Sequence, residues 1–278
     1  MVRQIFDLLV AMVRKNLLVM LRYPLSFASS FITLSIVVLI FLFATLMFTP
    51  GGVAQVATGG SGQRIGGTML YGLVLFLFVS DTLWSIGYNV RWEQQEGTLE
   101  SLYLTPASRF LYLVSRLAVP LFWTGLNAAV VLAFIWLLLG PLPTAHLGLA
   151  LYTLICTLAG IFGFGFCFAA FTLLVKESAQ STANLAQFAL MVVCAMFFPF
   201  SALPPVVRAI SRVVPLSYGV DLFRSALLGF PPGFPELASP AVEVAIVTAW
   251  GVLMPLVGYA AYRRAEHHVR ITGGLAEF

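Results

Sequence analysis

The sequence predicts an all-α membrane protein that crosses the bilayer six times. Of its 278 residues, 60% are hydrophobic and only 9% are charged, whereas a soluble domain carries about one quarter charged residues. Apolar runs of about 20 residues, the length that crosses the hydrocarbon layer, recur six times. Residues 1–278 are therefore expected to form one transmembrane domain. The six predicted spans cover approximately residues 25–48, 66–90, 112–140, 148–175, 184–203 and 241–262.

The cationic residues are distributed unevenly between the two sides of these spans. With the N-terminus inside, 11 of the 15 Lys and Arg residues fall on the cytoplasmic side. Such a bias toward the inner side predicts that both termini are cytoplasmic, in a cell membrane of the plasma or inner type. No basic face with interleaved aromatic residues appears, so a nucleic-acid partner gets no support. The four cations on the outer side are Arg64, Arg208, Arg212 and Arg224.

An amphipathic helix is predicted over residues 3–22, before the first span. Except for Asn16, its polar residues fall within about one third of the helical wheel, and Tyr23 precedes a proline that ends the pattern. Such a helix lies in the inner headgroup layer, with its apolar face toward the lipid chains and its cations toward lipid phosphate. It either anchors the chain and sets its orientation or holds a cytoplasmic partner.

The interval 204–240 should lie outside, before the last span. Pro204 and Pro205 begin one short helix, Pro215 interrupts it, and residues 218–228 continue as a second helix. Neither run is long enough to cross a bilayer, so both are expected to lie on the outer leaflet or to dip into it. Two charged pairs have helical spacing. They are Arg208 with Arg212, and Asp221 with Arg224.

A small-residue face is present within the fourth predicted span. Small side chains let membrane helices approach closely, so this face predicts helix packing rather than ligand binding. The three cysteines also lie within predicted spans and are interpreted as small apolar core residues, because no metal-ligand spacing accompanies them. The small residues are Ala159, Gly160, Gly163 and Gly165.

The chain lacks the motifs of an ATPase or a metalloenzyme. A phosphate-binding P-loop needs Gly-Lys-Ser/Thr, but the two lysines, Lys15 and Lys176, follow Arg14 and Val175. No zinc-protease signature or metal-chelating cluster is found. We therefore expect no catalytic residue, no metal and no cofactor in this chain, and any ATP must be hydrolysed elsewhere.

Four polar residues fall within the predicted spans, namely Asp81, Asn127, Gln187 and Glu243. An ionisable group at membrane depth is costly, so Asp81 is a functional candidate, although it is close enough to the end of its span to reach the inner headgroups. An intramembrane lipid-modifying enzyme would need Asp81 or Glu243 as a catalytic carboxylate. A channel or carrier independent of ATP would need polar groups across the bilayer, and four scattered ones are few.

The polar segment 92–109 separates the second and third spans on the cytoplasmic side. Glu93, Glu96 and Glu100 are spaced by three, four and seven residues and so share one helical stripe. Gly97 interrupts the helix, and Thr98 is a good N-cap for a short helix from residue 99 to 104. Leu99, Leu102 and Tyr103 supply apolar contacts beside the acidic stripe, and Thr105-Pro106 ends the short helix. The segment is either a docking helix for another protein or an ordinary solvated loop.

Two motifs resemble those of the type-2 family of ATP-binding-cassette (ABC) exporter permeases. Glu96-Gly97-Thr98-Leu99-Glu100, followed by Pro106 and Ser108-Arg109, is similar to the family's loop between spans two and three. Residues 215–229, PLSYGVDLFRSALLG, are similar to its second motif, Pro-Leu-x-Tyr followed by a basic residue. Pro215, Tyr218 and Arg224 match that motif. Within that family, the chain resembles drug and lipo-oligosaccharide exporter permeases.

The resemblance implies a permease that pairs with a second permease copy, as a homodimer or a heterodimer, and binds two ABC ATPase subunits that carry ATP and Mg. The helix after Gly97 would be the coupling helix to those ATPases. Spans two and five would line the path of an amphiphilic drug, lipid, glycolipid or polysaccharide. The implied coupling residues are Glu93, Glu96, Gly97, Thr98, Leu99, Glu100, Leu102, Tyr103, Pro106 and Arg109. The implied path residues are Asp81, Gln187, Phe197, Phe198 and Phe200.

Overall fold

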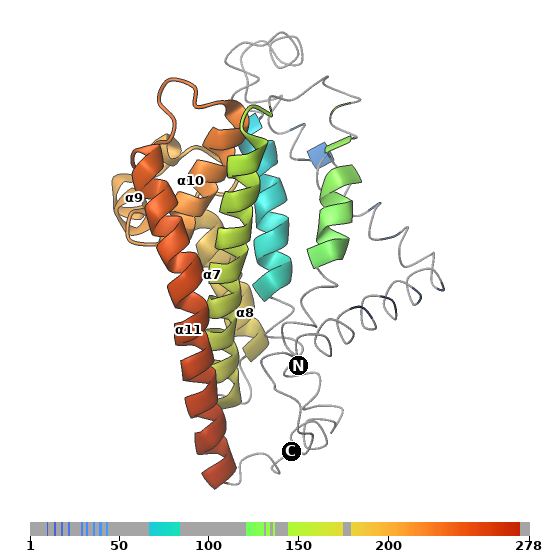
Figure 1. The fold of residues 1–278 in the computed structure, drawn as a ribbon, viewed down its shortest axis with the longest axis vertical. Coiled ribbons are helices and arrows are strands. Elements are labelled where there is room, and N and C mark those ends of the chain that lie inside the picture. The colour runs from blue at the N-terminus through green and yellow to red at the C-terminus, as the bar shows by residue number, and fades with distance from the viewer. Residues whose placement is uncertain are drawn as a thin grey trace.

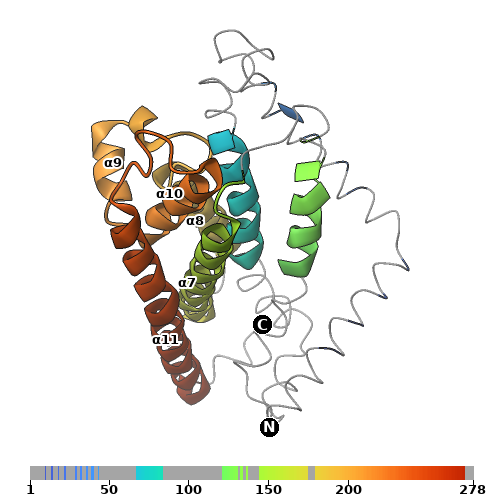
Figure 2. The ribbon, with the colours of Figure 1, turned by 45° about the horizontal axis from the view of Figure 1, so that its top comes forward.

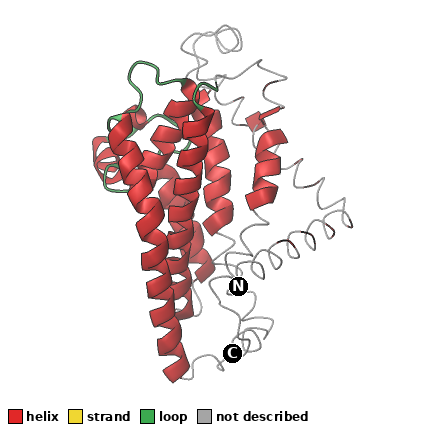
Figure 3. Cartoon of the chain, in the orientation of Figure 1, coloured by secondary structure: helices red, strands yellow, loops and turns green. Residues whose placement is uncertain are grey.

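The fold is helical throughout the part of the chain that the structure, a computed structural model, describes. That part comprises residues 67–83, 121–130, 144–174 and 179–272, with isolated positions between 10 and 43 and between 132 and 136. Helices and turns, and no strand, occur among these residues (Figure 3). The all-α prediction is confirmed there. The predicted segment 92–109 lies outside the described residues, as do all but isolated positions of the predicted helix 3–22.

Two long helices, α7 (Leu147–Leu174) and α11 (Pro240–Thr272), lie side by side along the molecule (Figures 1 and 2). Their apolar stretches of 25 and 26 residues, Leu147–Phe171 and Pro240–Ala265, are long enough to cross a membrane. These stretches agree with the fourth and sixth predicted spans. The remaining four spans are not confirmed as full crossings by the described residues.

Glycines allow α7 and α11 to pack backbone against backbone. A Cβ atom added at Gly163 would lie 2.2 Å from the carbonyl carbon of Met254, and one at Gly258 would lie 2.1 Å from the carbonyl oxygen of Gly163. Gly160 faces the ring of Trp250 equally closely. The small-residue face predicted in the fourth span is therefore a helix-packing face, and its partner is α11.

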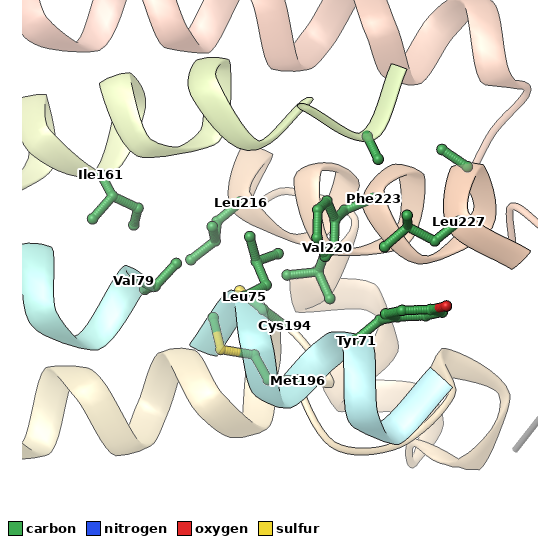
Figure 4. Close-up of a cluster of buried hydrophobic side chains, with 12 residues drawn as sticks. Tyr71, Leu75, Val79, Ile161, Cys194, Met196, Leu216, Val220, Phe223 and Leu227 are labelled. Carbon is green, nitrogen blue, oxygen red and sulfur yellow. The ribbon is translucent and has the colours of Figure 1, made fainter. Parts of the chain in front are cut away.

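The central core forms where α7 meets three other elements. These are the helix Gly67–Leu83, the segment after α8 (Ala179–Val193), and α10 (Pro215–Leu228). Leu75 and Val79 point from the first of these toward Leu216 and Val220 of α10 (Figure 4). The buried side chains of this core are Tyr71, Leu75, Val79, Ala150, Ile161, Cys194, Met196, Leu216, Val220, Phe223, Ala226 and Leu227.

The fifth predicted span, 184–203, is wrong beyond Val193, where α8 ends. The N–H of Ala195 donates to the carbonyl of Val192, and that of Met196 donates to the carbonyl of Met191. This is the hydrogen-bond pattern of a Schellman helix end, and Ala195 has the left-handed φ of +47° that it requires. Hydropathy could not reveal this end, because the residues of the turn are as apolar as those of the helix.

The two short helices predicted in 204–240 are confirmed. A 3₁₀ turn, η1 (Phe200–Ala202), precedes α9 (Pro205–Ser211), and α10 begins at Pro215 rather than at residue 218. Both prolines occupy the first helical position, where the missing N–H breaks no helical hydrogen bond. Most side chains of α10 are buried between α7 and α11, so this helix packs inside the protein instead of lying on a bilayer surface.

The replacement Gly163→Ala tests the contact between α7 and α11. The new Cβ would collide with the backbone at Met254 and Pro255, so we expect overpacking to destabilise the fold by about 1–3 kcal/mol. Thermal melting of the purified protein in detergent measures this effect. The matched control is Gly148→Ala on the same helix, where an added Cβ has no neighbour within 4 Å. Equal melting temperatures for the two variants would contradict the packing described.

Candidate functional site

The polar residues predicted for the transport path connect neighbouring helices. Thr124, in the helix Leu121–Val130, donates its hydroxyl to the Oδ2 atom of Asp81. Gln187 of α8 donates from Nε2 to the hydroxyl oxygen of Ser80, at 2.5 Å. The second predicted span is thus hydrogen-bonded to both the third and the fifth. Whether these side chains also line a path for substrate remains a prediction.

The three phenylalanines predicted near the outer gate lie in the turn after α8. Phe197 is buried and packs edge-on against Phe76, with ring centroids 5.0 Å apart. Phe200 is buried in a cluster with Ala195, against which Phe198 packs. Within this single chain the three rings therefore stabilise the turn, and their assignment to a gate remains a prediction.

Arg224 is a fully buried cation that holds the turn in place. It is only 1% exposed, and its Nη1 donates to the carbonyl of Phe198 at 3.1 Å, while Nη2 donates to the carbonyl of Ala195. Burial lowers the pKa of Arg224 to about 10, against the attraction of Asp221 and Glu236, so it stays charged at neutral pH. A Cβ at Gly72 would lie 1.8 Å from the carbonyl oxygen of Met196, which brings the second predicted span directly onto this turn.

Three more side chains hydrogen-bond backbone groups that have no helical partner in the same segment, residues 193–203. The hydroxyl of Ser211 donates to the carbonyl of Val193 at 2.6 Å. Arg208 donates to three carbonyls, those of Phe200, Ser201 and Leu203. Glu236 accepts from the N–H groups of Phe200 and Ser201, at 3.0 and 2.6 Å. Non-helical backbone away from water needs such partners, because an unpaired carbonyl or N–H is costly there.

A groove of about 370 Å³ opens beside this network. Phe200, Arg208 and Arg212 form one side, and the loop 233–237 forms the other. Tyr218, predicted as part of the second family motif, donates its hydroxyl to the carbonyl of Arg212 at 2.8 Å and so joins α10 to the end of α9. Pro215 of the same motif begins α10. Of the three motif residues Pro215, Tyr218 and Arg224, only Arg224 makes a direct hydrogen bond to the turn after α8.

The i, i+3 spacing of Asp221 and Arg224 suggested a pair, but their hydrogen bonds go to different partners. Asp221 accepts from the N–H groups of Glu236 and Leu237, whereas Arg224 donates to the turn after α8. The carboxyl group of Glu243 lies beside that of Asp221. The carboxyl group of Asp81 instead accepts a hydrogen bond from Thr124. The two carboxylates considered for an intramembrane enzyme therefore have different partners.

The predicted coupling residues, which run from Glu93 to Arg109, lie outside the described residues. Among the residues that the sequence left without a role, Ser211 and Glu236 belong to the network around the turn. Their partners are backbone groups 18 and about 35 residues away, so no local pattern marks them. Arg208 was noted only for its spacing from Arg212. Within the described chain, no group of three or more His, Cys, Asp or Glu side chains could hold a metal.

The described helices α7 and α11 have the length and apolar composition that a helical integral membrane protein needs to cross a bilayer. A family model described as ABC-2 type transporter matches residues 7–228. This match spans most of the chain, from the predicted N-terminal helix to the last residue of α10, and the chain belongs to the ABC-2 type transporter family. It is therefore a membrane subunit of an ABC transporter, and the resemblance found in the sequence is confirmed. No individual curated protein matches it.

The replacement Arg224→Leu tests the role of the buried guanidinium. It would leave the carbonyls of Ala195 and Phe198 without their donor in an apolar site, and we expect a loss of about 2–4 kcal/mol. Thermal melting in detergent gives the measurement. Arg224→Lys keeps the charge but loses the two-pronged geometry, so it should recover only part of the loss.

Arg212→Gln is the control for Arg224→Leu, because Arg212 is exposed at the end of α9. A surface substitution of this kind changes stability by about 0.5 kcal/mol or less. If Arg224→Leu melted like Arg212→Gln, the guanidinium would not be holding the turn.

Proposed function

We propose that this chain is the permease subunit of an ABC exporter that moves an amphiphilic drug, lipid, glycolipid or polysaccharide outward. Two separate ABC ATPase subunits hydrolyse the ATP, with Mg, and a second permease copy completes the path. Family membership carries this proposal, because ABC-2 permeases work with an ABC ATPase and are not themselves enzymes. The proposed location is a cell membrane, with both termini in the cytoplasm.

The contacts of the second span support a mechanism for coupling. Residues 92–109, which carry the acidic stripe, join the helix Gly67–Leu83 to the helix Leu121–Val130 in the chain. A displacement of this loop by the ATPases would reach both helices, which are tied to each other through Asp81 and Thr124. From there it would reach α8 through Ser80 and Gln187.

The turn after α8 lies at the far end of this chain of contacts. Phe76 packs on Phe197, and Gly72 lies against the carbonyl of Met196, so motion of the second span would be felt there. We propose that closure of the ATPases shifts the bundle between inward-facing and outward-facing or closed forms. An amphiphile suits this bundle, since many of its exposed large side chains are apolar.

The charge-reversing replacements Glu96→Lys and Glu100→Lys test the coupling assignment. Each places a cation on the proposed docking stripe, so we expect both to weaken co-purification of the ATPase subunit by roughly tenfold or more, or about 1.4 kcal/mol. The permease should still insert in the membrane at its usual level. Co-expression with the partner ABC ATPase, followed by affinity purification through the permease, gives the measurement.

Gln94→Lys adds a cation to the same loop but off the stripe, and it should leave the complex intact. Unchanged co-purification of both glutamate variants would count against the coupling helix. Transport by the permease alone in liposomes, without ATPase or ATP, would instead favour a channel or carrier.

A further inference from the structure

We propose that Asp221 and Glu243 form a buried acid pair that binds one proton between their carboxyl groups, and that this proton fastens the loop 229–239 and α10 to the first turn of α11. The inference concerns a site apart from the proposed coupling loop and path. It does not depend on the transported substrate.

The two carboxyl groups come from different helices and are both removed from solvent. Asp221 of α10 is 1% exposed and Glu243 of α11 is 0% exposed. Both accept from consecutive backbone N–H groups of one loop, residues 236–238, so the two carboxyl groups lie next to each other. A hydrogen bond between two carboxyl groups requires a proton, because ionised carboxylates only accept.

The remaining hydrogen bonds leave one oxygen of each group for that proton. Asp221 accepts through Oδ2 from the N–H groups of Glu236 and Leu237, at 2.7 and 2.9 Å. Glu243 accepts through Oε1 from the N–H of Ala238 at 3.1 Å. The other oxygens, Oδ1 and Oε2, accept from no N–H or O–H of the described residues, and both are buried. One shared proton satisfies both oxygens.

The surrounding charges do not replace the proton. Arg224 attracts Asp221, but its Nη1 and Nη2 atoms donate to carbonyls of the turn after α8, and no ion pair forms between the two described side chains. Glu236 faces the pair from the loop and adds a third negative charge, while its oxygens accept from Phe200 and Ser201.

Two further groups belong to the surroundings of the pair. The Cys194 thiol faces Arg224 from the segment after α8, and Arg208 of α9 binds the carbonyl of Phe200. Neither donates to the acid pair. With every carboxyl ionised, like charges would meet in a site without water, which favours retention of a proton.

The titration of Asp221 agrees with this geometry. Burial raises the pKa of Asp221 to about 6, although the N–H groups of Leu237 and Glu236 and the charge of Arg224 act in the opposite sense. A carboxyl in the unfolded chain has a pKa of about 4, so the folded state binds the proton more tightly. The stability linked to Asp221 is therefore fully present below about pH 4 and is lost as the pH rises through about 6, where Asp221 ionises. The pair then keeps one shared proton, because losing it would leave two negative charges side by side away from water.

Infrared difference spectroscopy of the full chain in lipid nanodiscs tests the proposal directly. The wild type should show the carbonyl band of a protonated carboxylic acid at neutral pH, with a shift in heavy water and a loss at high pH. Asp221→Asn and Glu243→Gln should each remove it. Glu236→Gln is the control, because both oxygens of Glu236 already accept backbone hydrogen bonds, and it should keep the band.

Melting temperatures across pH provide the second measurement. An amide in either position donates the missing hydrogen bond without a proton, so Asp221→Asn and Glu243→Gln should both flatten the fall in stability between about pH 4 and 6. Absence of the acid band in the wild type would overturn the proposal, even if a variant failed to fold. A band that persists in both amide variants would overturn it as well.

A bound metal cation is the alternative occupant of the pair. If added Na⁺ or Ca²⁺ at constant pH raised the melting temperature of the wild type but of neither amide variant, the pair would hold that cation. This result would overturn the proton assignment. Insensitivity to both salts and to a chelator would support it.

Discussion

The structure depends on the pairing of the Arg224 guanidinium with the carbonyls that are exposed where α8 ends. A helix satisfies its own backbone, but the turn at residues 194–203 does not, and an apolar environment offers little water in its place. Arg224 reaches this turn from α10 and binds the carbonyls of Ala195 and Phe198. Without such a donor, these carbonyls would be buried with no hydrogen-bond partner. The position of α10 and the end of α8 therefore depend on the same hydrogen bonds.

The packed pair of helices α7 and α11 supports α10, which carries Arg224. Gly163 and Gly258 bring the two backbones into contact, and α10 packs on both helices at one end. Gly219 of α10 meets Thr157 of α7 at a distance that leaves no room for a larger residue. Since this pair of helices positions α10, it also positions Arg224 and Asp221. The turn after α8 and the loop 229–239 therefore take their places from helices distant in the sequence.

The contacts of the second predicted span suggest how the proposed permease could transmit motion between its helices. The second predicted span contacts the helix Leu121–Val130 through Asp81, α8 through Ser80, and the turn after α8 through Gly72. It is also the span from which the segment 92–109 continues toward the third. A force on that segment would act on a helix that packs against the turn after α8. The network of Arg208, Arg224 and Glu236 would make that turn respond as a unit.

Much of this protein followed from the sequence alone, because hydropathy and proline spacing are local properties. Apolar length identified a helical membrane protein and the positions of α7 and α11, prolines identified α9 and α10, and a short acidic motif identified the family. Burial of Arg224, the end of α8 at Val193 and the meeting of Asp221 with Glu243 were decided only by the tertiary structure. Each of these requires partners 18 or more residues apart. Hydropathy cannot distinguish a helix from an apolar turn whose hydrogen bonds come from elsewhere in the fold.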